Sequence, residues 1–289
     1  MSKNRRSFLF AAVCCLVVAL TTVAHGQSLT VRGDRWLTLT QKEGPVALIP
    51  YQSERRAARI GDRLVSAGDT VITGSEASAR LDVDTGTGFV TMAENSRLSV
   101  QSLSITADGG RVTELAVDRG QVRLQVRPLT NPGSRLEIYT PAGVSGVRGT
   151  EFGIAVQPNG QTGVATLAGS VATSAQGETV IVGTQQQSTV RPGEPPTPPE
   201  PLRDDPTLFV TSLSTVRGQR AVRIIGYTDT VNLLEIDNEL RTLDREGRFD
   251  LVIPLPAVDG DLSRYRQRRI LALVTTPLGT EQKYELVAP

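Results

Sequence analysis

Arg148 is the first residue whose chemistry needs an explanation, because its permanent charge lies in a nearly apolar, glycine-rich segment, TPAGVSGVRGTEFG at 140–153. One interpretation is an anion site, in which backbone amides and the guanidinium grip a carboxylate or phosphate. The glycine spacing fits neither a dinucleotide-binding loop nor a P-loop. We therefore expect a structural motif in which a buried arginine donates to carbonyls left free by a tight bend and Glu151 shares its charge. The motif comprises Gly143, Gly146, Arg148, Gly149, Glu151 and Gly153.

Asp84-Thr85-Gly86-Thr87 has the order of the catalytic tetrad of aspartic proteases, in which two carboxylates share one proton. The tetrad occurs once, so a second carboxylate would have to come from a second copy of the chain. A hairpin turn between Val83 and Val90 is the simpler interpretation. Asp82 and Asp84 share one side of their strand, but the later oxygen ligands of a calcium loop are missing. We predict a solvated strand face and no metal.

A basic cluster is the other candidate for binding. It lies near Tyr265, and a solvated surface is the expected role, with an anionic cell-envelope polymer as the alternative. Its members are Arg264, Arg266, Arg268 and Arg269.

Catalytic side chains are scarce. Cys14, Cys15 and His25 all fall in residues 1–26, so residues 27–289 contain no cysteine and no histidine. The usual triads, thiolate nucleophiles and zinc or haem sites are therefore excluded there, and we expect no cofactor and no enzyme activity. The 31 basic residues lose Lys3, Arg5 and Arg6 with that segment, which leaves 28 against 30 acidic residues. That balance does not suggest a nucleic-acid partner.

The amino-terminal segment has the pattern of a signal peptide. Three basic residues precede an apolar run at 8–24, and small residues follow at Ala24 and Gly26. We expect cleavage before Gln27 and a periplasmic or secreted protein, exported by a Sec or twin-arginine signal. The run is also long enough for a retained anchor, which would bring membrane contact.

Seven prolines in the fifteen residues 192–206 divide the rest of the chain. Such a segment cannot join a helix or a central strand, and it predicts an extended spacer of up to roughly 40 Å. The predicted organisation is a signal peptide at 1–26, a domain at 27–191, a linker at 192–206 and a second domain at 207–289. Whether residues 27–50 add a strand to the first domain stays open.

Both domains show the period-two alternation of half-buried strands, as at Ala79, Leu81 and Val83 or at Val122 and Leu124. The fold class is therefore all-β. In the first domain a barrel, a sandwich and a β-solenoid all fit the periodicity. The second domain has the length and strand number of a small immunoglobulin-like sandwich, with a possible short helix at 261–270.

Several stretches of the first domain occur in the order of a known family. The segments IGDRLVSAGDTVITGSEASARLDV, AENSRLSV, GQVRLQV and TPAGVSGVRGTEFGI together resemble the FecR domain over residues 50–196. The resemblance implies an exported all-β module with a β-solenoid or β-roll. The family is named for a periplasmic regulator that relays a signal from an outer-membrane receptor to a sigma factor. This chain has only seven residues before its apolar run, where such regulators carry an anti-sigma segment.

The carboxyl-terminal segments DREGRFDLVIPL and TTPLGTEQKYEL resemble bacterial immunoglobulin-like modules. The expected function is thus that of an exported, non-enzymatic binding or scaffold protein of the cell envelope, with protein or envelope-polymer partners. The alternative is a periplasmic sensor component of a FecR-type signalling system.

Overall fold

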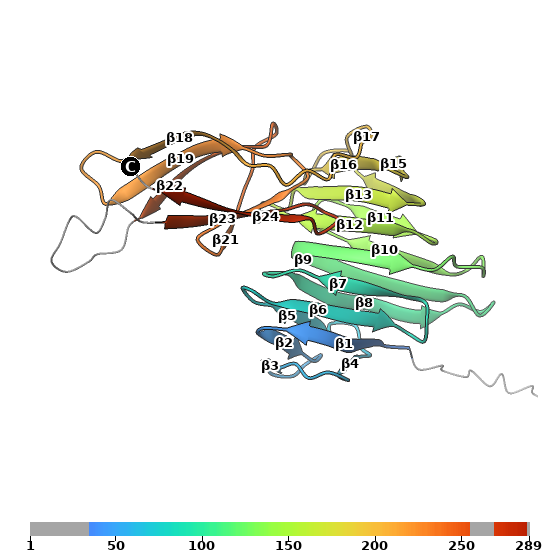
Figure 1. Ribbon diagram of the computed structural model, residues 1–289. Helices are drawn as coiled ribbons and strands as arrows, with labels where there is room; N and C mark the ends of the chain where they lie inside the picture. Colours follow the sequence, from blue (N-terminus) through green and yellow to red (C-terminus); the bar gives the residue numbers. More distant parts are fainter. Residues whose placement is uncertain (1–34, 255–268, 288–289) are drawn as a thin grey trace, which may run out of the picture. The chain divides into compact units, whose positions relative to one another are not determined.

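The computed structural model describes residues 35–254 and 269–287 (Figure 1). Strands and turns make up this part of the chain, and it contains no helix, so the all-β class is confirmed. It follows that no helix within the described ranges could cross a membrane. The predicted signal peptide, most of the possible helix at 261–270, and Arg264, Arg266 and Arg268 lie outside the described residues.

Two sheets form the first half of the structure. Sheet A contains, in spatial order, β4 (Arg63–Leu64), β1 (Leu37–Glu43), β6 (Ser78–Val83), β7 (Gly88–Met92), the second half of β9 (Arg111–Val126), β12 (Glu151–Val156), β13 (Thr162–Ala168), β16 (Gln186–Val190) and β17 (Glu200–Pro201). Sheet B contains β3 (Arg56–Ala57), β2 (Val46–Ile49), β5 (Thr70–Thr73), β8 (Arg97–Ile105), the first half of β9, β10 (Arg135–Tyr139), β11 (Val144–Val147), β14 (Ser170–Ala175) and β15 (Glu178–Gly183). Of residues 27–50, the described part from 35 onward therefore contributes to both sheets, through β1 and β2.

Strand β9 joins the two sheets at Gly120. Residues before this glycine pair with β8 and β10, and residues after it pair with β7 and β12. Gly120 has φ +86°, and a Cβ there would lie 2.4 Å from the Cα of Ser96. Only glycine combines this backbone angle with so close an approach, so it fixes where the strand changes sheets.

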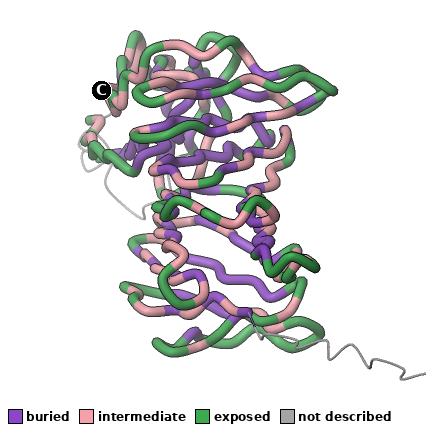
Figure 2. The backbone as a smooth tube through the Cα atoms, turned by 90° about the vertical axis from the view of Figure 1, so that its right-hand side faces the viewer, coloured by how far each residue is buried: buried purple, intermediate pink, exposed green. Residues whose placement is uncertain are grey.

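The core fills the space between sheets A and B. Alternate residues of β6 are buried, as the sequence predicted, and the same alternation is visible along other strands (Figure 2). Leu81 and Leu124 from sheet A meet Leu98 and Leu115 from sheet B in one apolar cluster. Among the strands of the described ranges, β9 with β10 is the one parallel pair and the rest are antiparallel, so the parallel coils of a conventional β-solenoid are not confirmed.

The carboxyl-terminal half is a second two-layer arrangement. Sheet C consists of β18 (Phe209–Thr215), β19 (Ala221–Tyr227) and β22 (Arg248–Pro254), and sheet D of β21 (Glu239–Arg241), β20 (Leu233–Ile236), β23 (Arg269–Thr275) and β24 (Glu281–Val287). Its own apolar cluster includes Val222, Ile224, Leu234 and Ile270. These seven antiparallel strands suit the predicted small sandwich, while its immunoglobulin-like character stays a prediction.

The proline-rich segment is not a free spacer. Its strand β17 pairs with β16, and the Thr197 and Leu202 amides donate to the Thr189 and Gln185 carbonyls at 2.9 Å each. The prediction of a separation of up to roughly 40 Å is therefore wrong, because backbone bonds hold the segment against sheet A. The domain boundaries at 191 and 207 stay predictions, since Asp34–Pro289 forms one compact unit.

Close polar contacts join the two halves of that unit. Gln121 Nε2 donates to the Pro277 carbonyl at 2.7 Å. Gln157 donates to the Asn232 carbonyl at 3.1 Å and accepts from the Leu243 amide at 3.0 Å. Both glutamines are buried, so these bonds satisfy groups that would otherwise be costly to bury.

Candidate functional site

Arg148 is exposed, which corrects the prediction of a buried guanidinium. It lies directly after β11, where Val147 faces inward and its neighbour therefore faces outward. Its Nη2 donates to the Pro132 carbonyl, in agreement with a carbonyl partner. The predicted charge sharing with Glu151 is wrong, because Glu151 pairs with Arg123 instead.

The glycines of the motif differ in what surrounds them. A Cβ on Gly153 would lie 1.7 Å from the Pro277 carbonyl oxygen, and one on Gly143 would lie 2.4 Å from the Ser174 oxygen. Gly149 has φ +144°, and its Cβ would lie 2.6 Å from Pro128. A Cβ on Gly146 would meet no atom closer than 3.8 Å, the distance to Glu137 Cγ. Close approach thus explains three of the four glycines, and Gly153 serves the contact with the carboxyl-terminal half.

Among the described residues, Arg35 carries a buried guanidinium, two residues before β1 begins. Its Nη2 lies 2.7 Å from Asp84 Oδ2, with side-chain exposures of 4% and 8%. Other donors of Arg35 reach Thr113 Oγ1 at 2.7 Å and the Ser104 carbonyl at 3.0 Å, and the Val112 carbonyl accepts a further bond. A buried charge with these partners is satisfied.

Asp84 is therefore one partner of a buried ion pair. It begins the turn between β6 and β7, so the predicted hairpin is confirmed. The expectation of a solvated face is wrong for Asp84, because Arg35 covers it. The expectation of a solvated position agrees with the structure for Asp82, whose side chain is 41% exposed. Within the described ranges no three potential metal-binding side chains gather into a site.

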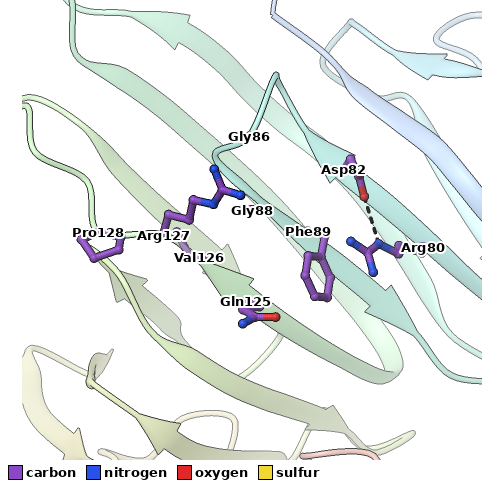
Figure 3. A pocket seen from close by; sticks show the side chains of 9 residues that line it. All are labelled: Arg80, Asp82, Gly86, Gly88, Phe89, Gln125, Val126, Arg127 and Pro128. Atoms are coloured by element: carbon purple, nitrogen blue, oxygen red, sulfur yellow. Dashed lines mark hydrogen bonds and ion pairs between the residues drawn. The ribbon is translucent and has the colours of Figure 1, made fainter.

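A hollow on the outer face of sheet A is the main concave feature near these residues (Figure 3). It has a volume of about 460 Å³. The lining comes from the β6–β7 hairpin and the end of β9: Arg80, Asp82, Gly86, Gly88, Phe89, Gln125, Val126, Arg127 and Pro128. Arg80 and Arg127 line one hollow because β7 pairs with β9, which brings Phe89 opposite Gln125.

The hollow has an excess of positive charge. Arg80 lies over the Phe89 ring, 3.6 Å from its centroid, and its Nε donates to Asp82 Oδ1 at 3.1 Å. Arg127 makes no side-chain hydrogen bond or ion pair with any residue that the structure describes. The lining thus carries two guanidinium groups and one carboxylate, and an anion is the group that would balance this charge.

A second hollow of about 350 Å³ adjoins the first, with Phe89 and Gln125 lining both. It extends over β12 to the turn between β23 and β24. Here Arg123 is already paired with Glu151 and donates to the Leu278 carbonyl at 3.3 Å. Burial, together with the charge of Glu94, raises the pKa of Glu281.

The protein is all-β, and the two adjoining hollows together form a polar groove on the outer face of sheet A. The family model described as FecR protein matches residues 69–172, so the chain carries a FecR domain and the predicted resemblance is confirmed.

Two crystal structures of a proposed anti-sigma factor from Parabacteroides distasonis ATCC 8503 are similar to part of the chain. The structure at 1.65 Å resolution is 15% identical to this chain and has a TM-score of 0.38. The match covers 46% of this chain and 59% of the crystallised chain. The structure at 2.50 Å resolution is 14% identical and has a TM-score of 0.33. The match covers 40% of this chain and 51% of the crystallised chain. The chain thus spans between 51% and 59% of the length of these structures. No curated protein matches the sequence.

Proposed function

We propose that this protein is an exported, non-enzymatic binding or scaffold protein of the bacterial cell envelope that acts through contacts with proteins or surface polymers. The observation that carries the proposal is the hollow beside Arg127, where a sheet face presents a guanidinium that no described residue pairs with. An unpaired charge in a concave surface is suited to holding an opposite charge. Asp84, by contrast, is buried and paired with Arg35 at 2.7 Å, so its charge faces a residue of the same chain.

The sequence supports the remaining parts of the proposal. The leader pattern of residues 1–26 favours export, and residues 27–289 offer neither imidazole nor thiol for catalysis. No cofactor is needed for a role that depends on surface contacts.

Crosslinking in the native envelope, followed by purification of the tagged chain and identification of its partners, tests the proposal. Recovery of surface polymer or of envelope assembly proteins is the expected result. Turnover of any substrate by the purified protein would contradict the non-enzymatic role.

A sensor component of a FecR-type signalling system is the second candidate, and the FecR match over residues 69–172 favours it. In that role the protein would contact a receptor or regulator supplied by another chain. The same crosslinking experiment separates the two candidates, because recovery of an anti-sigma protein or of an outer-membrane receptor would place signalling first.

A further inference from the structure

We propose that the hollow over β7 and β9 binds a uronic acid residue within an acidic polysaccharide, with the Arg127 guanidinium holding the carboxylate. This inference rests on the proposed function, since it names the chemical class of the polymer. The hollow's volume of about 460 Å³ lies within the usual range for ligand sites.

The carboxylate is the part of the ligand that the charges specify. Arginine has five N–H donors in a planar fork that matches a carboxylate, and Arg127 uses none of them within the described chain. Arg80 contributes a second positive charge, and its Nε donates to Asp82 Oδ1 at 3.1 Å. One ligand carboxylate would bring the charge of this hollow to zero.

The other polar groups favour a sugar over an acidic peptide. Asp82 is a carboxylate that only accepts hydrogen bonds, and the Gln125 amide both donates and accepts. Sugar hydroxyls also do both, so a uronic acid can donate to Asp82 while its carboxylate faces Arg127. A run of acidic side chains would bring like charge against Asp82. The single aromatic ring, Phe89, is covered on one face by Arg80 and leaves little room for an apolar peptide anchor.

The second hollow indicates that the ligand is a chain with separated charges. It shares Phe89 and Gln125 with the first, so a ligand can continue from one into the other. There Glu151 and Glu281 outnumber Arg123, and another carboxylate would be repelled. A neutral sugar beside the uronic acid fits this change of sign, as in a polysaccharide in which acidic and neutral residues alternate.

The floor of the first hollow is built to stay in place. Strand β7 lies between β6 and β9, and each of its residues pairs with a residue of both neighbouring strands. A Cβ on Gly88 would lie 2.3 Å from the Gln125 carbonyl oxygen, which shows how closely the strands approach. A surface held in this way loses little conformational freedom when it binds.

The test is isothermal titration calorimetry of the full chain with a hyaluronan tetrasaccharide, which alternates glucuronic acid and a neutral amino sugar. Neutral chitotetraose and hexaglutamate serve as comparison ligands. The key variant is Arg127→Gln, directly after β9, and its matched control is Arg119→Gln, an exposed arginine within β9 that lines neither hollow. Gln125→Ala is a second groove variant, and a thermal melt of each protein confirms that it is folded.

We expect the hyaluronan tetrasaccharide to bind, Arg127→Gln to weaken its dissociation constant by about tenfold, and Arg119→Gln to change it less than about twofold. Absence of binding, equal affinity for chitotetraose, or an unchanged dissociation constant in both groove variants would overturn the inference. Tighter binding of hexaglutamate would also overturn it and assign the hollow to an acidic protein segment, within the proposed function. Cleavage of the tetrasaccharide would instead contradict the non-enzymatic function.

Discussion

Asp84→Asn tests whether the ion pair with Arg35 holds the amino-terminal end of the fold in place. Asparagine has the same shape and tolerates the left-handed backbone of this residue, whose φ is +47°. The substitution therefore removes the charge with little change in conformation. Arg35 would keep its carbonyl and hydroxyl partners but lose its counter-charge in a site where its side chain is 4% exposed.

Loss of one partner of a buried ion pair costs about 3 to 5 kcal/mol. For a unit of this size, 1 kcal/mol corresponds to about 2 to 4 °C in melting temperature, so we expect a decrease of about 6 to 20 °C. Arg111 strengthens the effect, because its Nη1 lies 3.6 Å from the Asp84 carboxylate and would then face Arg35 without an intervening negative charge.

The assay is calorimetric melting together with urea denaturation, and Asp118→Asn is the matched control. Asp118 pairs with Arg97 at 2.9 Å on the surface, with side-chain exposures of 53% and 38%. Its loss should cost no more than about 1 kcal/mol. The double variant Arg35→Met with Asp84→Asn should lose less than the sum of the single variants. If Asp84→Asn were as stable as Asp118→Asn, the ion pair would not stabilise the fold as argued.

Three further predictions concern stability. Arg148→Ala should change the free energy of unfolding by less than about 1 kcal/mol in urea denaturation, because the side chain is exposed; a loss near 3 kcal/mol would restore the idea of a buried charge. Gly153→Ala should lower the melting temperature and make the carboxyl-terminal half more sensitive to limited proteolysis, since its Cβ would lie 1.7 Å from a carbonyl oxygen. Gly146→Ala should change neither the melting temperature nor the sensitivity to proteolysis, because its Cβ would lie 3.8 Å from the nearest atom. Burial, partly offset by the Asn95 hydrogen bond, raises the pKa of Glu235, so this carboxyl contributes stability that is present below its ordinary pKa and is lost as the pH rises. Glu235→Gln should therefore reduce the loss of stability as the pH rises above the ordinary pKa of glutamate in melts across a pH series, and an identical pH profile would contradict the assignment.

The strands were predictable because half-buried strands leave a local signal. In β6 and in the second half of β9 every second residue is apolar, and those residues belong to the core between sheets A and B. The hairpin at Asp84 was predictable for the same reason, since glycine and polar residues separate two such runs. Neither signal specifies which strands pair, and the exchange of β9 between two sheets depends on the close approach of Gly120 to Ser96.

The parts that the sequence could not predict are the partners of charged and proline-rich segments. Arg35 reaches Asp84 across 49 residues, and no spacing rule links the two. The prolines at 192–206 were assumed to be free because they lack donors, yet the Thr197 and Leu202 amides between them supply the bonds that attach the segment. The groove depends on the register of β7 against β9, which emerges only from the folded structure.

Arg35, Arg148 and Arg127 have the same side chain, but their roles differ because different groups accept the hydrogen bonds of their guanidinium donors. At Arg35 the donors are used by buried acceptors and a carboxylate, so removing the counter-charge must destabilise the fold. At Arg148 one donor meets a carbonyl at the surface, and water satisfies the rest at little cost. At Arg127 the donors meet no described group although the residue lines a hollow, so its loss should leave stability nearly unchanged and reduce binding. Melting temperatures and dissociation constants measured on the three arginine variants should therefore move independently, and a parallel change in both quantities at Arg127 would show that its role is structural.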